Sequence, residues 1–218
     1  MKAPTAPLAT RLDALLPQTQ CRRCGFDGCL PYAEALAAGS STPNRCPPGG
    51  IATIAALSEL LATPPPRPDP AVWPADPQIA LDADQALVPT VAVIDEDRCI
   101  GCFKCVLVCP VDAIIGAPKY LHTVIADDCS GCDLCLPPCP VDCIEMVPRP
   151  ATLSPADAMA ERWRSLHRAR KARLVRDRES RDEARRQRRG ELLARQAQGY
   201  DIAAAIARAR SRKSSNPP

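Results

Sequence analysis

The sequence has few of the features that mark membrane proteins and exported proteins. Its most apolar stretch, Ile51 to Ala62, runs for only twelve residues and contains Ser58 and Glu59. That stretch is too short and too polar to span a bilayer. The first twenty residues have no continuous apolar segment followed by a small-residue cleavage site, so we expect no signal peptide and a reducing cytosolic location.

The sequence also lacks the common signatures of catalysis. It has no G-x-G-x-x-G, no Walker loop, no H-E-x-x-H and no nucleophile elbow. Only 3% of its residues are aromatic, and its two histidines, His122 and His167, have no obvious partner. His122 precedes a strand pattern, and we expect it to be structural. We therefore expect no catalytic residues and no stand-alone enzyme.

What the chain does have is cysteine: thirteen in 218 residues. In a reducing compartment, closely spaced cysteines indicate metal ligands before disulfides. The charge is divided, since residues 1–150 carry 10 basic and 17 acidic side chains, while residues 151–218 carry 18 and 8. This pattern predicts an acidic body and a basic tail.

Composition divides the chain into four regions, and the predicted fold class is α+β. Residues 1–62 hold four cysteines between two helical patterns, and residues 63–90 form a proline-rich linker. Residues 91–149 contain two copies of a strand, cysteine loop and short helix, which predict a ferredoxin-like βαββαβ domain. Residues 150–218 predict a helical tail rich in alanine and arginine, with breaks near Gly190 and Gly199.

The repeat in residues 91–149 has a period of thirty and the pattern Cys-x2-Cys-x2-Cys-x3-Cys-Pro in each copy. In such runs three thiolates hold one [4Fe–4S] cluster and the fourth ligates the other cluster. A pair of zinc knuckles is the alternative, but zinc sites separate their cysteine pairs by a longer gap. The predicted ligands are, for cluster 2, Cys99, Cys102, Cys105 and Cys139, and for cluster 3, Cys109, Cys129, Cys132 and Cys135.

The first region has a different spacing, Cys-x2-Cys-x4-Cys-x16-Cys. On spacing alone zinc competes with iron and sulfur at this site. The neighbouring cluster domain and the absence of a nearby histidine favour a [4Fe–4S] cluster. The predicted ligands of cluster 1 are Cys21, Cys24, Cys29 and Cys46. The thirteenth cysteine, Cys143, aligns with Ala113 in the repeat, and we expect it to be a small buried residue without a redox role.

Two stretches carry a resemblance to a known family. One is LLPQTQC at 15–21 with GC at 28–29 and CPPGG at 46–50; the other is DRCIGCFKCVLVCPVDAIIGA from Asp97 and GCDLCLPPCPVDCIEM from Gly131. Together they resemble the B subunit of the Rnf (or Rsx) electron transport complex over residues 8–149.

The resemblance implies an electron-transfer subunit with three [4Fe–4S] clusters. In that family the complex couples electron flow between ferredoxin and nicotinamide to ion movement across the inner membrane, and other subunits hold the flavin and nicotinamide sites. Family members usually begin with a membrane anchor that this sequence does not show. We therefore expect a cytoplasmic protein, docked peripherally on the inner membrane beside the other subunits.

Two alternatives remain open from the sequence. The chain could be a soluble ferredoxin serving a cytosolic oxidoreductase, or an iron–sulfur interaction protein whose basic tail binds nucleic acid. Trp163 and Tyr200 are the tail's only candidates for stacking on bases, which does not support base reading. The tail could also pack on the acidic body.

Overall fold

The computed structural model describes residues 6–74, 81–197 and 202–214. It divides into two units, residues 1–170 and residues 171–218, and the boundary lies within a long helix. Among the described residues, no helix is both long and apolar enough to cross a membrane.

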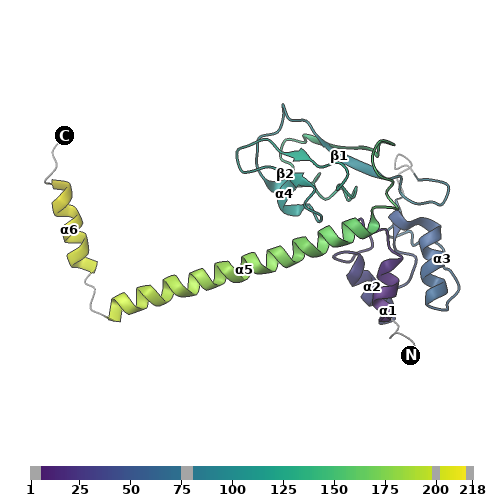
Figure 1. Ribbon diagram of the computed structural model, residues 1–218, viewed down its shortest axis with the longest axis horizontal. Coiled ribbons are helices and arrows are strands. Elements are labelled where there is room, and N and C mark those ends of the chain that lie inside the picture. The colour runs from purple at the N-terminus through teal and green to yellow at the C-terminus, as the bar shows by residue number, and fades with distance from the viewer. Residues whose placement is uncertain (1–5, 75–80, 198–201, 215–218) are drawn as a thin grey trace. The chain divides into compact units, whose positions relative to one another are not determined.

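The first region is helical, as expected, and lies at the N-terminal end of unit 1 (Figure 1). It contains α1 (Leu8–Ala14), α2 (Cys29–Ala37), the 3-10 turn η1 (Pro47–Gly49) and α3 (Gly50–Leu60). Helix α2 was not predicted from the sequence, although its buried residues recur at the helical spacing i, i+3, i+4 and i+7. These are Cys29, Tyr32, Ala33 and Leu36, and they form one core with Leu12, Leu16 and Leu57.

The proline-rich segment packs back onto this helical region in its described residues. The backbone N–H of Leu87 donates to Pro47 O at 3.1 Å, and the N–H of Ile51 donates to Asp84 O at 2.8 Å. The side chain of Asp69 accepts a hydrogen bond from Arg45 at 2.6 Å. The segment is therefore fixed to the helical region at several points.

The repeat region contains β1 (Thr90–Ile94), α4 (Lys104–Val108), β2 (Ile114–Ile115), β3 (Thr123–Val124) and β4 (Ile144–Pro148). The strands form two antiparallel pairs, β1 with β4 and β2 with β3. A shift of thirty residues converts one pair into the other, since Ile94 faces Ile144 and Val124 faces Ile114. Each pair thus takes one strand from each copy, and the copies interlock around a pseudo-twofold axis.

The second copy departs from the expected pattern. The first copy has helix α4 between its third and fourth cysteines, whereas the second has only turns over residues 134–138. Pro137 and Pro138 explain the difference, because each lacks an N–H donor and its ring clashes with the preceding helical turn. The mixed helix and small-sheet fold is as expected, but the short helix predicted after the fourth cysteine is formed in neither copy, since residues 110–113 and 140–143 are turns and coil.

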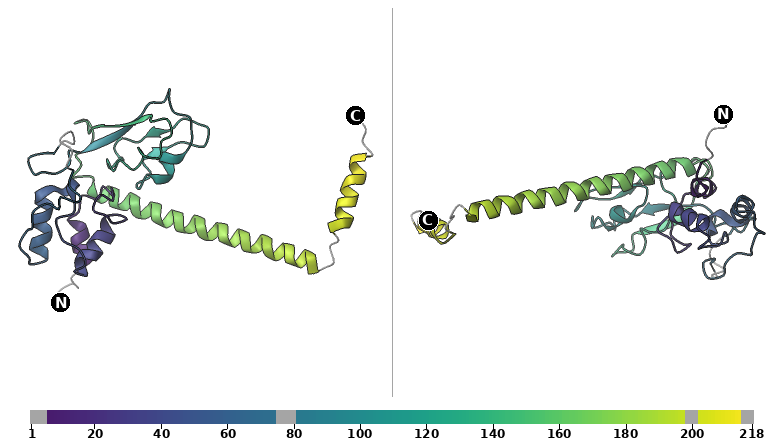
Figure 2. Two further views of the ribbon diagram at one scale, coloured as in Figure 1. Left: turned by 180° about the vertical axis from the view of Figure 1, so that it is seen from behind. Right: turned by 90° about the horizontal axis from the view of Figure 1, so that it is seen from below.

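Helix α5 (Ala160–Ala197) begins inside unit 1. Its first turns lie beside both the helical region and the strands, which Figure 1 and the view from behind in Figure 2 show. Trp163 is 2% exposed and joins the core of the repeat region together with Met159. The residue that the sequence offered as a stacking candidate is therefore buried.

Unit 2 contains the rest of α5 and helix α6 (Ile202–Ser214). Helix α5 continues through Gly190, so the break predicted there is wrong. A glycine costs about 1 kcal/mol relative to alanine in a helix, which is too little to end a helix of 38 residues. The other predicted break, Gly199, and the aromatic residue Tyr200 lie outside the described residues.

Candidate metal centres

The twelve predicted ligands line three hollows in unit 1. Each hollow contains about 270–300 Å³ of space that atoms do not fill, part of it open to solvent. Cavity 1 is lined by Cys21, Cys24, Cys29 and Cys46. Cavity 2 is lined by Cys99, Cys102, Cys105, Cys139 and the thirteenth cysteine, Cys143. Cavity 3 is lined by Cys109, Cys129, Cys132 and Cys135.

The crossing of the fourth cysteine follows from the interlocked strands. Cys109 belongs to the first copy but lies in the cavity of the second, and Cys139 does the reverse. Since each strand pair contains one strand from each copy, the chain that follows each third cysteine crosses the pseudo-twofold axis. Metal ligation by these cysteines remains a prediction.

The chemistry of the donors suits a metal centre. Burial raises the pKa of the thiols of Cys29 and Cys135 to about 12, and that of Cys105 to about 11. Neighbouring cysteines raise the pKa of each thiol further. Buried thiols this close together do not ionise at neutral pH without a compensating positive charge, which iron would supply. The predicted cysteine ligands and the apolar residues that line each hollow are of the kinds that hold an iron–sulfur cluster.

The sequence predicts that apolar side chains, among them Ile100, Ile114 and Ile144, bury the clusters of the repeat region, and the structure differs from this prediction in one respect. Ile114 and Ile144 are buried beside the cavities as expected, at 4% and 9% exposure. Ile100, which was expected to bury a cluster, lines cavity 2 but is 59% exposed. Cavity 2 thus has one edge close to solvent.

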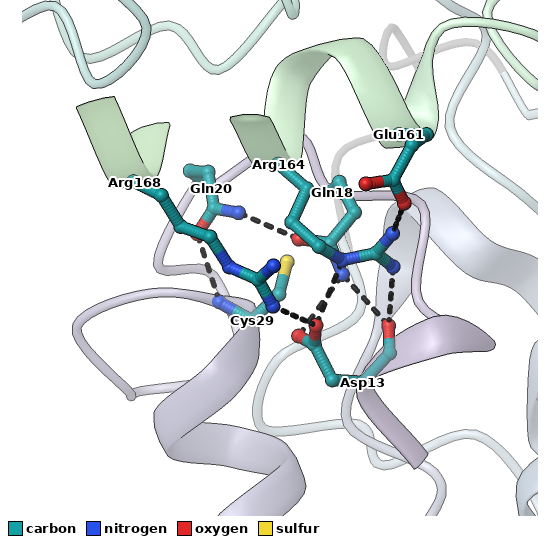
Figure 3. Close-up of polar contacts among 7 residues, drawn as sticks. All are labelled: Asp13, Gln18, Gln20, Cys29, Glu161, Arg164 and Arg168. Atoms are coloured by element: carbon teal, nitrogen blue, oxygen red, sulfur yellow. Dashed lines mark hydrogen bonds and ion pairs between the residues drawn. The ribbon is translucent and has the colours of Figure 1, made fainter. Parts of the chain in front are cut away.

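A buried polar network holds the backbone of cavity 1 and was not predicted from the sequence (Figure 3). The N–H of Cys29 donates to Gln20 Oε1 at 3.0 Å, and Gln20 Nε2 donates to Gln18 Oε1 at 2.8 Å. Gln18 Nε2 in turn donates to Asp13 Oδ1 at 3.0 Å. All three polar side chains are at most 3% exposed, so the network fixes the start of α2 from within the core.

Helix α5 completes this network. Arg164 Nε lies 2.9 Å from Asp13 Oδ2 and its Nη2 donates to the Asp13 backbone oxygen at 3.0 Å (Figure 3). Arg168 approaches the same carboxylate at 4.0 Å. Gly28 lies against this network, because a Cβ on it would be 2.7 Å from Gln20 Oε1. A glycine with φ of +144° is needed there to let Gln20 reach the Cys29 N–H.

Direct contacts connect cavity 1 to cavity 3. Ser130, which lines cavity 3, donates to the backbone oxygen of Thr19, which lines cavity 1, at 2.9 Å. Arg23 forms an ion pair with Asp133, another residue of cavity 3. Residues 19 and 23 therefore contact residues 130 and 133 directly.

His122 is the second site residue whose role the sequence did not predict. It was expected to be structural and without partners, but its Nδ1 lies 3.3 Å from Cys105 Sγ and 3.8 Å from Cys99 Sγ. The ring is 1% exposed and lines cavity 2. The repeat could have indicated this residue, because the first copy has an alanine, Ala92, at the position that corresponds to His122.

These features define the class of the protein, an iron–sulfur protein with a helical module and a repeated module. Comparison with known families agrees. Residues 92–146 match the family described as "4Fe-4S dicluster domain", and residues 16–48 match the one described as "Putative Fe-S cluster". No solved structure matches the chain.

Curated relatives then identify the family. The chain is 59% identical over 120 residues to the B subunit of the ion-translocating oxidoreductase complex of Pseudomonas paraeruginosa, a match covering 55% of this chain and 56% of that one. It is 55% identical over 148 residues to the B subunit of the same complex from Aeromonas salmonicida, covering 67% and 72%. The chain belongs to the family of B subunits of ion-translocating oxidoreductase complexes. Its match spans little more than half the length of the Pseudomonas relatives.

Proposed function

We propose that this chain relays single electrons through three [4Fe–4S] clusters as the B subunit of an Rnf-type complex. The observation that carries the proposal is the grouping of the twelve predicted ligands into three hollows, four in each. The names of the relatives support a place in a multi-subunit oxidoreductase that moves ions. When bound, the clusters supply reversible one-electron chemistry.

The protein's own residues serve this function by holding and shielding the clusters. The cysteines of cavities 1, 2 and 3 are the proposed ligands of clusters 1, 2 and 3. The proposal includes a ferredoxin-like arrangement over residues 91–149, a four-iron domain over residues 1–62 and a connecting segment over residues 63–90. The basic tail was predicted from residue 150, and residues 171–218 of it form unit 2. The buried network from Asp13 to Cys29 keeps the backbone of cavity 1 fixed, which favours fast transfer because little rearrangement is needed.

The contacts within unit 1 also support an order for the relay. Cavity 1 adjoins cavity 3 through Thr19 and Ser130, and the pseudo-twofold repeat places cavity 2 as the partner of cavity 3. We therefore propose the order cluster 1, cluster 3, cluster 2. The electron donor and acceptor would be other subunits of the complex, at the cytoplasmic face of the membrane.

The test is anaerobic purification of the tagged full chain from its native cells, beside a truncation that ends at Arg170. Recovery of integral membrane flavoprotein subunits, with electrons passing from them to the bound chain, would support the proposal. Recovery of soluble oxidoreductases alone would favour a free-standing ferredoxin. Loss of the membrane subunits from the truncation would assign docking to residues 171–218.

A nucleic-acid role is the other alternative, and the structure gives it less support. The stacking candidate Trp163 is buried in the core of unit 1. Binding of duplex DNA that falls steeply with added salt, together with clusters that accept no electrons, would favour that role over electron transfer.

A further inference from the structure

The two cavities of the repeat region are related by the thirty-residue shift, so their differences are informative. Beside cavity 3 two backbone donors reach ligand sulfurs: the N–H of Ala92 donates to Cys129 Sγ at 3.4 Å, and the N–H of Ala113 donates to Cys109 Sγ at 3.2 Å. Beside cavity 2 the side chains of His122 and Cys143 contact ligand sulfurs. Two alanines beside cavity 3 are replaced by polar side chains beside cavity 2, namely His122 in place of Ala92 and Cys143 in place of Ala113.

His122 is oriented to donate to the ligands of cavity 2. Its Nδ1 faces Cys105 Sγ at 3.3 Å, while its Nε2 is buried without a hydrogen-bond partner among the described residues. A proton on Nε2 would leave a buried donor unpaired and set the Nδ1 lone pair against a thiolate. A proton on Nδ1 gives an N–H···S hydrogen bond and leaves only an acceptor unpaired, which costs less. The geometry therefore assigns the Nδ1–H tautomer.

Cys143 makes the second contact. Its Sγ lies 3.6 Å from Cys139 Sγ, within hydrogen-bond reach for sulfur. If Cys139 is a ligated thiolate, it has no proton to give, so Cys143 S–H must be the donor. A thiol is a weak donor, so its effect should be smaller than that of the imidazole.

Polar side chains also line cavity 3, but they bond to groups other than the cysteine sulfurs. Ser130 directs its hydroxyl to the Thr19 backbone oxygen, and Asp133 pairs with Arg23. The Ser130 hydroxyl proton is thus committed to an oxygen, and a carboxylate has no proton to donate to a sulfur.

From these contacts we propose that His122 and Cys143 donate hydrogen bonds to the thiolates of cluster 2 and raise its reduction potential. A reduced cluster carries one more negative charge than an oxidised one, and a hydrogen bond to a ligating sulfur stabilises that extra charge. The inference rests on the proposed function, since it requires a cluster in cavity 2.

The test is a redox titration of the iron-loaded full chain, followed by electron paramagnetic resonance. His122→Leu fills a similar volume without an N–H. We expect it to lower one midpoint potential by an amount equal to about a tenfold change in the ratio of reduced to oxidised cluster, about 59 mV for one electron. His122→Asn, whose amide N–H can occupy the Nδ1 position, should retain most of the wild-type potential.

Cys143→Ala is an independent variant that should fold, because the repeat already has alanine at the equivalent position, Ala113. We expect a smaller fall of the same midpoint potential. Clusters 1 and 3 act as internal controls in every variant. Cys102→Ser and Cys132→Ser identify the moving signal, since each alters one proposed ligand of cluster 2 or cluster 3.

Three results would overturn the inference: unchanged potentials in both His122→Leu and Cys143→Ala, equal shifts in His122→Leu and His122→Asn, or movement of the cluster that Cys132→Ser alters. If His122→Leu does not retain iron, His122→Asn and Cys143→Ala still decide the matter. A wild-type chain with too little iron for two clusters in residues 91–149 would instead contradict the proposed function.

Discussion

The buried side chain of Asp13 connects helix α5 to the residues that hold cavity 1. Its carboxylate is joined to Arg164 of α5 on one side and to Gln18 on the other, and the hydrogen bonds continue through Gln20 to Cys29 (Figure 3). A buried charge whose partner is removed destabilises a protein strongly, because the desolvation cost is no longer compensated. The ion pair of Asp13 and Arg164 therefore holds together the backbone of cavity 1 and the first turns of α5.

We predict that Arg164→Met destabilises the iron-loaded protein by roughly 3 kcal/mol, since Arg168 remains near Asp13 at 4.0 Å and compensates only in part. In a chain of this size that is about 6–12 °C in the midpoint of thermal unfolding. Scans at one fixed heating rate measure it.

Arg22→Met is the matched control, because the Arg22–Asp27 pair is exposed, with side-chain exposures of 55% and 86%. It should change the midpoint little. Equal falls in the midpoint of thermal unfolding of the two variants would mean that the buried ion pair stabilises the protein no more than the exposed pair does.

For individual residues, the sequence predicted which cysteines line the cavities but not which side chains contact them. The spacing of Cys99, Cys102 and Cys105 is local, so it could be recognised without a structure. The environment of His122 depends on the contact between the start of β3 and the first cysteine loop, and a local sequence pattern does not predict such a contact. The same holds for Gln20, whose partners are the backbone of α2 and Gln18.

Among the secondary-structure elements, the strand pairs position both cavities of the repeat region. Gly131 belongs to the loop between two proposed ligands of cluster 3 and approaches β1 closely, since a Cβ on it would lie 2.5 Å from Thr90 O. Gly101 makes the equivalent approach to Tyr120 O in the first copy. These close approaches fix each cysteine loop against a neighbouring segment of the backbone.

We predict that Gly131→Ala costs more than about 3 kcal/mol, because the left-handed conformation adds about 1–2 kcal/mol to the steric clash with Thr90. Unfolding of the iron-loaded protein and its iron content both measure the effect.

Gly39→Ala is the matched control, since Gly39 has φ of +69° against +66° for Gly131 but nothing within 4 Å of a Cβ. It should cost only the conformational part, about 1–2 kcal/mol. If both substitutions cost the same, the close approach to Thr90 is unimportant.

The elements that the sequence predicted are those with strong local signals. The β-branched run from Val91 to Ile94 indicated β1, and the apolar spacing from Ile51 to Leu61 indicated α3. Helix α4 has no counterpart in the second copy because the adjacent prolines, Pro137 and Pro138, outweigh the similarity of the copies. The break expected at Gly190 was wrong because the helix-forming residues around it outweigh one glycine.

For the whole molecule, the boundary between body and tail lies later than composition suggests. Composition changes at residue 150, but Met159 and Trp163 belong to the core of the repeat region and Arg164 to the network of cavity 1. Unit 1 extends to Arg170. Charge composition could not reveal that unit 1 extends past residue 150, because two buried residues among many charged ones hardly change the average charge of the segment.

We predict that a chain ending at Pro150 unfolds at least about 10 °C below the full chain, since the loss of a buried tryptophan alone costs about 3–5 kcal/mol. A chain ending at Arg170 should unfold within a few degrees of the full chain. Thermal scans of the three iron-loaded proteins measure this. Equal midpoints for the two truncations would show that residues 151–170 contribute nothing to unit 1.

The most direct test of the central claim is to count iron and acid-labile sulfide in the full chain purified without exposure to oxygen. Three clusters of four irons predict about twelve iron atoms and about twelve sulfides per chain, with about four of each lost in a variant that replaces Cys21, Cys24 and Cys29 by alanine. About eight irons accompanied by zinc would contradict a four-iron cluster in cavity 1. No iron in the chain would contradict the account as a whole.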